Sequence, residues 1–116
     1  MKITTTNPYV DAVTRILQLQ QEAEHIYNSL KNNSYTVYKL NGCGHCTRLM
    51  SLLQPYMESG KITIKDVQDE GVQEEIQKMS ENEETKIQGF PTAFRSDGKK
   101  CVGSRGSVYD WLMAFE

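Results

Sequence analysis

Two of the three cysteines, Cys43 and Cys46, stand three positions apart in the run Cys43-Gly44-His45-Cys46. At this spacing one thiolate can attack a disulfide, and the second thiol can then resolve the mixed disulfide. Gly44 leaves room for an approaching substrate disulfide, and His45 supplies part of a positive charge that favours a thiolate. The tetrad therefore predicts a thiol–disulfide centre.

The residues around the tetrad predict how its thiols are tuned. Residues 34–40 are β-branched and aromatic, which predicts a strand, and Asn41-Gly42 ends it. Apolar residues at helical spacing follow from Leu49 onward. Cys43 would then lie at a helix N-terminus, where free N–H groups and the helix dipole favour the thiolate, with Cys46 buried one turn behind it. A stabilised thiolate also makes the disulfide form a better oxidant.

Two other uses of these cysteines are a metal site and a pair of buried structural thiols. Zinc sites commonly need four ligands in two close pairs, and beyond the tetrad only Cys101 and His25 remain as candidates. The glycine and histidine between the cysteines have no packing role in a buried pair. We expect no metal and no organic cofactor, because the cysteine pair carries two electrons itself. Cys101 is expected to be a half-buried small residue, with a regulatory or dimer-forming thiol as the alternative.

The rest of the chain predicts an α/β domain with a central mixed sheet flanked by helices. Asn7-Pro8 is a strong helix start, and apolar residues at three- and four-residue steps predict a long amphipathic helix from Pro8 to about Lys31. Asp97-Gly98 predicts a hairpin turn. The predicted elements are a short strand over 2–6, the long helix, a strand over 34–40, a helix from the tetrad to 57, a strand over 62–67, a helix over 69–79, strands over 90–94 and 100–103, and a helix over 108–115. Alternation of strands and helices, closed by one hairpin, is typical of this class.

Length and composition narrow the classes of function. A chain of 116 residues makes a single domain, here an N-terminal helical extension over 1–33 and a core redox domain over 34–116. A formal charge of -2 without a basic stripe argues against nucleic-acid binding. No apolar run approaches the roughly 20 residues of a spanning helix, and neither end carries a signal or lipidation motif, so we expect a cytoplasmic protein that does not engage membranes. We also expect a monomer.

Cys43-Gly44-His45-Cys46 together with Gly89-Phe90-Pro91-Thr92 resembles the thioredoxin superfamily, particularly the catalytic domains of protein disulfide isomerases. The similarity includes Gly103-Ser104-Arg105 and the helix after it, and it covers residues 34–115. The strand over residues 35–39 looks glutaredoxin-like. The resemblance implies a thioredoxin-like fold and disulfide exchange with protein substrates, with glutathione as an alternative co-substrate.

The resemblance also implies roles for single residues. Cys43 would be the nucleophile, Cys46 the resolving thiol, and His45 the residue that tunes both. Pro91 would follow a cis peptide bond and pack beside the disulfide, leaving the backbone of Phe90 free to pair with an extended substrate segment. Arg105 matches an arginine that in the isomerases can approach the buried thiol and modulate its pKa.

The chain departs from the isomerases in several places. Val37 stands where they carry a buried carboxylate, Gly42 where they carry a tryptophan, and Pro55 lies later than their helix-kinking proline. The long first helix exceeds that of a thioredoxin; we expect it to cover a sheet face, with a partner or dimer contact as the alternative. Two rival functions therefore stay open: a glutathione-coupled glutaredoxin, and a non-enzymatic binding module whose cysteines are structural or bind metal.

Overall fold

The computed structural model describes residues 7–116, so the strand predicted over residues 2–6 lies outside the described part. The elements alternate in the predicted order. They are α1 (Pro8–Asn32), β1 (Tyr35–Lys39), α2 (Gly44–Leu53), the 3₁₀ helix η1 (Gln54–Ser59), β2 (Ile62–Asp66), α3 (Glu70–Met79), β3 (Thr92–Arg95), β4 (Lys100–Val102) and α4 (Val108–Met113).

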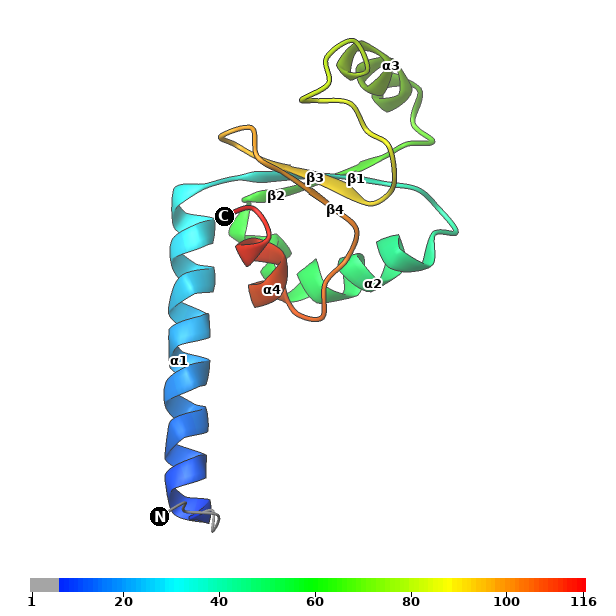
Figure 1. The fold of residues 1–116 in the computed structure, drawn as a ribbon. Coiled ribbons are helices and arrows are strands. Elements are labelled where there is room, and N and C mark those ends of the chain that lie inside the picture. The colour runs from blue at the N-terminus through cyan, green and yellow to red at the C-terminus, as the bar shows by residue number, and fades with distance from the viewer. Residues whose placement is uncertain (1–6) are drawn as a thin grey trace.

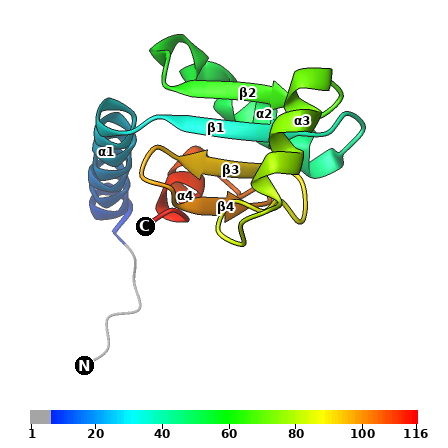
Figure 2. The ribbon, with the colours of Figure 1, turned by 90° about the horizontal axis from the view of Figure 1, so that it is seen from above.

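The four strands form one mixed sheet in the order β2-β1-β3-β4. β1 and β2 are parallel, with Lys39 beside Asp66 in the register, whereas β3 is antiparallel to both β1 and β4. α2 and α4 lie on one face of the sheet and α3 lies on the other (Figures 1 and 2). This arrangement confirms the predicted α/β class with a mixed central sheet.

The core lies between the sheet and the helices α2 and α4. Leu49 and Leu53 of α2 are fully buried there, as predicted from their helical spacing. Three aromatic rings tie β1 to α4, with ring centroids 5.0 to 5.3 Å apart. They belong to Tyr35, Trp111 and Phe115. The sheet and α2, which flank the loop that carries the cysteines, therefore share one buried core.

The other face of the sheet is covered more lightly, by α3. Its apolar residues are only half-buried, and a polar contact completes the attachment. The Tyr38 hydroxyl donates a hydrogen bond of 2.7 Å to Glu75, which also pairs with Lys65 at 2.7 Å. These contacts hold α3 over β1 and β2.

Two predicted boundaries are wrong, and a proline lies near each. The helix predicted to reach residue 57 ends as an α-helix at Leu53 and continues as η1, because Pro55 has no N–H for an α-helical hydrogen bond. The strand predicted from Phe90 begins at Thr92 instead, since Pro91 cannot donate to the sheet ladder.

The expectation that α1 covers a sheet face is also wrong. Both faces are already taken by other helices, and α1 extends away from the sheet (Figure 1). The described molecule is therefore elongated, with extents of 62 × 27 × 25 Å. Only the C-terminal end of α1 is anchored, by buried Leu30 and by Ile26, which packs against the core. Within residues 7–116, no helix combines the length and the apolar character that crossing a bilayer requires.

His25 is half-buried near the base of α1. Its Nε2 lies 3.5 Å from a carboxylate oxygen of Glu116, and its ring meets Tyr109 edge-on at 5.4 Å. The histidine thus helps to join α1 to the end of the chain.

Candidate active site

The loop between β1 and α2 places Cys43 at the start of a helix. Cys43 is the N-cap of α2, as the sequence predicts, and its backbone is extended. Gly42 before it has a φ of +79°, a conformation that side-chain-bearing residues rarely adopt. This explains why glycine stands there rather than a bulky aromatic residue.

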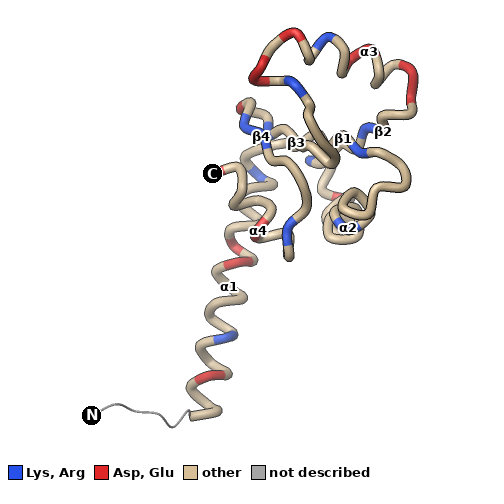
Figure 3. The backbone as a smooth tube through the Cα atoms, turned by 45° about the vertical axis from the view of Figure 1, so that its right-hand side comes forward, with Lys and Arg blue, Asp and Glu red and all other residues tan. Residues whose placement is uncertain are grey.

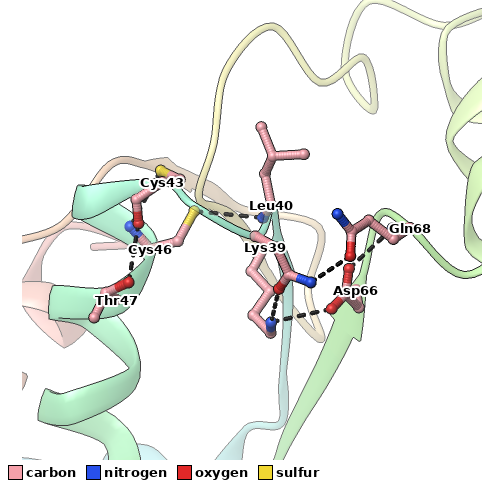
Figure 4. A network of polar contacts seen from close by, with 8 residues as sticks. Lys39, Leu40, Cys43, Cys46, Thr47, Asp66 and Gln68 are labelled. Atoms are coloured by element: carbon pink, nitrogen blue, oxygen red, sulfur yellow. Dashed lines mark hydrogen bonds and ion pairs between the residues drawn. The ribbon is translucent and has the colours of Figure 1, made fainter.

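The Cys43 thiol is positioned to ionise easily. Its Sγ accepts a hydrogen bond from the Cys46 backbone N–H at 3.3 Å, and the side chain is partly exposed (Figure 4). A hydrogen bond from the Cys46 thiol and the N–H groups of Cys46 and His45 together lower the pKa of Cys43. Each of these donors stabilises the thiolate more than the thiol. Cys43 is therefore both nucleophilic and reachable.

Cys46 lies behind it in the opposite environment. Cys46 is only 2% exposed. Burial is the main cause that raises the pKa of the Cys46 thiol, and the hydrogen bond that this thiol donates to Cys43 raises it further. The Leu40 N–H donates to Sγ of Cys46 at 3.5 Å and partly offsets this rise. The two cysteines are free thiols here, and they differ in burial and in the direction in which their pKa values are shifted.

The segment before β3 forms the other wall of the site. The Phe90–Pro91 peptide bond is cis, as the resemblance implied, and Pro91 is buried. The Cys43 thiol donates to the Phe90 carbonyl at 3.6 Å, while the Pro91 carbonyl is occupied by the Gly103 N–H at 2.7 Å. Within the described residues, the Phe90 N–H has no hydrogen-bond partner. The Phe90 backbone is thus adjacent to the nucleophile and still able to pair.

A charged pair beside Cys46 was missed by the sequence reasoning. Lys39 Nζ lies 3.1 Å from Asp66 Oδ2 and donates to Asn41 Oδ1 at 2.9 Å (Figure 4). The Lys39 charge offsets a small part of the rise that burial causes in the pKa of Cys46. Val37, at the position of the absent carboxylate, is fully buried among apolar residues. The available signal was positional: Lys39 and Asp66 lie near the ends of two predicted strands that one predicted helix separates in the sequence.

Asp66 is held in its charged form by the same network. The backbone N–H of Gln68 donates to Asp66 Oδ1 at 2.9 Å, and this bond together with Lys39 lowers the pKa of the carboxyl. Asn41 and Gln68 also hydrogen-bond to each other through their side chains. The network therefore holds the Lys39 and Asp66 side chains in place, and the Lys39 charge acts on the Cys46 thiol.

Of the remaining predicted residues, Arg105 is not brought to the thiols, whereas Gly44 and His45 lie between the two cysteines. Arg105 Nη1 donates to the carbonyls of Val102 and Ser104, at 3.2 and 3.0 Å, and within residues 7–116 no polar contact joins its side chain to Cys43 or Cys46. The His45 side chain is exposed and Gly44 has open space around it.

Cys101, predicted to be half-buried, is fully buried on β4 opposite Ala93, and its burial raises the pKa of the thiol. It therefore lies in the core, and its environment differs from that of the exposed Cys43.

No protein-family model matches the chain, and no curated protein matches it significantly. Within residues 7–116, no group of three or more histidine, cysteine or acidic side chains is arranged to share a metal ion. The arrangement can carry out disulfide exchange chemically: an exposed thiol with a lowered pKa, a buried thiol in contact with it, and an unpaired backbone N–H alongside.

Proposed function

We propose that the chain is a thiol–disulfide oxidoreductase with a thioredoxin-like fold that oxidises or isomerises the disulfides of protein substrates. The observation that carries the proposal is the asymmetry of the two thiols. Cys43 is accessible with a lowered pKa, and Cys46 is buried with a raised one. Reaction through a mixed disulfide needs this division between attacking and resolving thiols.

The order of elements supports the thioredoxin-like part of the proposal. From β1 onward the chain runs β1-α2-β2-α3-β3-β4-α4, with the tetrad after the first strand and the cis peptide bond before the third. The tetrad and the proline are 45 residues apart in sequence, counted from Cys46 to Pro91, yet the Cys43 thiol contacts the Phe90 carbonyl. The two motifs that carried the resemblance therefore form one site.

In the reducing half of the cycle, the Cys43 thiolate attacks one sulfur of a substrate disulfide. A Cys43–substrate disulfide forms, and the other substrate sulfur leaves as a thiolate that takes up a proton. Cys46 then loses its proton and attacks Cys43 Sγ, which forms the Cys43–Cys46 disulfide and releases the second substrate thiolate. The substrate gains two electrons and two protons, and the cysteine pair supplies them. Isomerisation follows when the released substrate thiolate attacks a different disulfide instead.

In the oxidising half, the same steps run backward and the substrate dithiol is oxidised. Stabilisation of the Cys43 thiolate favours the reduced pair, and it therefore raises the tendency of the Cys43–Cys46 disulfide to accept electrons. The hydrogen bonds to Cys43 provide that stabilisation. We therefore expect the pair to be more oxidising than one with an ordinary thiol pKa.

Substrate binding would use the Phe90 backbone. An extended substrate segment can pair with the free Phe90 N–H as an added strand does, which brings its disulfide next to Cys43. Backbone pairing selects for extended peptide rather than for a particular side chain. The proposal thus favours protein substrates with exposed disulfides over small thiols.

The test compares the wild type with Cys46→Ser on two probes, a disulfide-linked peptide and a glutathionylated peptide. We expect the wild type to turn over the disulfide-linked peptide, and we expect Cys46→Ser to accumulate a Cys43–peptide disulfide that mass spectrometry detects. Sustained turnover of the glutathionylated peptide by Cys46→Ser would show a glutaredoxin instead. If the wild type turns over neither probe, the binding-module function is favoured and the proposal is overturned.

A further inference from the structure

The outer part of α1 carries an apolar stripe that nothing in the described chain covers. The stripe follows alternating steps of three and four residues over three heptads, the spacing of a coiled-coil seam. Its members are Tyr9, Ala12, Ile16, Leu19, Ala23, Ile26 and Leu30. We call this set the α1 stripe.

Exposure along the α1 stripe changes from one end to the other. Leu30 is buried and Ile26 packs against the core, whereas Ile16 is 54% and Leu19 46% exposed. Tyr9 at the far end is 77% exposed. At the C-terminal end of α1 the globular part of the chain thus covers the α1 stripe. Over the four preceding turns of the helix the stripe is exposed. Contiguous exposed apolar surface of this kind marks an interaction site.

The length of the projecting helix strengthens this point. Helices in water gain most of their stability from burial of an apolar face, and short isolated ones are marginal. Figure 3 shows few charged residues along α1. Asp11 and Arg15 stand four residues apart, but among the ion pairs of the described residues none joins two side chains of this helix, so ion pairs add little to its stability. Burial of the α1 stripe against another apolar surface would supply the stabilisation that the projecting helix lacks.

We infer that the α1 stripe pairs with the same stripe of a second copy of this chain, as an antiparallel two-helix seam. In this pairing Ile16 packs against Leu19 of the second copy, and Ala12 packs against Ala23. Tyr9 of each chain lies opposite Ile26 of the other. The paired segment from Tyr9 to Ile26 spans 18 residues, about 27 Å of helix.

Charges beside the stripe select this register. Arg15 and Glu22 occupy equivalent flanking positions, one residue before Ile16 and one before Ala23. In the antiparallel register above, Arg15 of each chain faces Glu22 of the other, so two opposite-charge pairs form. Sliding the helices by one heptad, so that Ile16 packs against Ala12, would bring the two Arg15 side chains together. Flanking charges of this kind set the orientation of helix pairs.

A parallel pairing is disfavoured by the same residues. It would place Arg15 beside Gln20 and Glu22 beside Tyr27, with no charge pair. It would also bring both globular parts to one end of the seam. There, Leu30 is already buried by its own chain.

A groove at the base of α1 accommodates the end of the second helix. The groove has a volume of about 500 Å³ and is lined mainly by apolar side chains. Ala23 and Ile26 of the α1 stripe form one side, and Tyr56 lies on the other. Because Tyr9 of the second copy lies opposite Ile26, its ring is placed to enter this groove. The proposed symmetric dimer differs from the monomer that the sequence led us to expect.

The test is sedimentation equilibrium of the full chain under reducing conditions, which excludes dimers joined by disulfides. The wild type should be a dimer, and Leu19→Glu should be a monomer because it places charge in the seam. Leu17→Glu is the matched control: Leu17 is 55% exposed but lies outside the α1 stripe, so this variant should stay dimeric. A monomeric wild type, a larger assembly, or equal effects of the two substitutions would overturn the inference.

Charge reversal then tests the register. Arg15→Glu and Glu22→Arg should each weaken the dimer by roughly tenfold, because each creates two like-charge pairs. The double variant restores both pairs with their signs exchanged and should recover the wild-type dissociation constant. If the double variant is as weak as either single one, the antiparallel register is wrong. An unchanged alkylation rate of Cys43 in every variant serves as the control for folding.

Discussion

Helices α1 and α2 both begin with a side-chain N-cap, but the two caps have different neighbours. Asn7 caps α1 by accepting the Tyr9 N–H at 2.9 Å, and Cys43 caps α2 by accepting the Cys46 N–H at 3.3 Å. The Asn7 cap is exposed, whereas the Cys43 cap is in contact with a buried thiol and with the carbonyl before a cis proline. Capping thus determines where a helix starts, and the neighbours of the cap determine whether it is reactive.

We expect the largest effect from Cys43→Ser, a substitution that keeps the helix cap and removes the thiol. Serine is itself a good N-cap residue, so Cys43→Ser should keep α2 intact while it removes the nucleophile. We expect the exchange rate to fall roughly a thousandfold or more, because a hydroxyl at neutral pH cannot replace a thiolate in disulfide exchange. Turnover of the disulfide-linked peptide measures this. Cys101→Ala is the control and should keep near wild-type turnover; loss of activity in both variants would contradict the assignment.

The next effect tests the difference in packing between the two helices. Leu49 of α2 is fully buried, and Leu49→Ala should lower the free energy of unfolding by about 2 to 5 kcal/mol. Leu17→Ala in α1 removes the same atoms from a residue that is 55% exposed. This substitution should change the free energy of unfolding by about 0.5 kcal/mol or less. Urea denaturation of both variants makes the comparison. Similar losses would mean that the outer part of α1 is packed after all.

Much of this difference in packing could not be predicted from the sequence. Both helices show apolar residues at helical spacing, which indicates that a face is buried but not by what. For Leu49 the burying surface is the sheet of the same chain. For Ile16 and Leu19 that surface is absent from the described chain, since helices α2, α3 and α4 already cover the sheet (Figure 1).

The site was predicted better where it depends on local sequence. The helix start at Cys43 follows from the strand, the Asn41-Gly42 break and the apolar spacing, and the contact between Cys43 and Phe90 joins the two motifs that were singled out. The Lys39–Asp66 pair was missed because it depends on the register of two parallel strands. Arg105 was assigned a role by analogy, and in the structure its side chain bonds to carbonyls of its own loop.

The third prediction concerns the pH dependence of Cys43. Its lowered pKa means that the thiolate forms at lower pH than in an ordinary cysteine, whose pKa is near 8.5. The rate of alkylation of Cys43 should therefore reach half its maximum below that pH, and the reduced protein should gain stability as pH rises through the same interval. Because alanine lacks the donor that the Cys46 thiol provides, the pH at which alkylation of Cys43 is half-maximal should shift toward the ordinary value in Cys46→Ala. An ordinary pKa in the wild type would contradict the assignment.

The smallest predicted effect tests the charged pair beside Cys46. The positive charge of Lys39 lowers the pKa of Cys46, so Lys39→Met should raise it and move the resolving step to higher pH. At neutral pH we expect release of a preformed Cys43–peptide disulfide to slow by roughly three- to tenfold. Lys65→Met is the control, because Lys65 pairs with Glu75 of α3 on the opposite face of the sheet. Equal slowing in both variants would show that the effect is not specific to Cys46.

The most direct test of the central claim is a redox titration of the wild type in graded glutathione buffers, read by alkylation and mass spectrometry. We predict one two-electron transition, in which Cys43 and Cys46 form a disulfide with each other while Cys101 stays a thiol. The midpoint should be more oxidising than that of a dithiol with ordinary pKa values. If no transition occurs, or if Cys43 pairs with Cys101 instead, the redox function is contradicted.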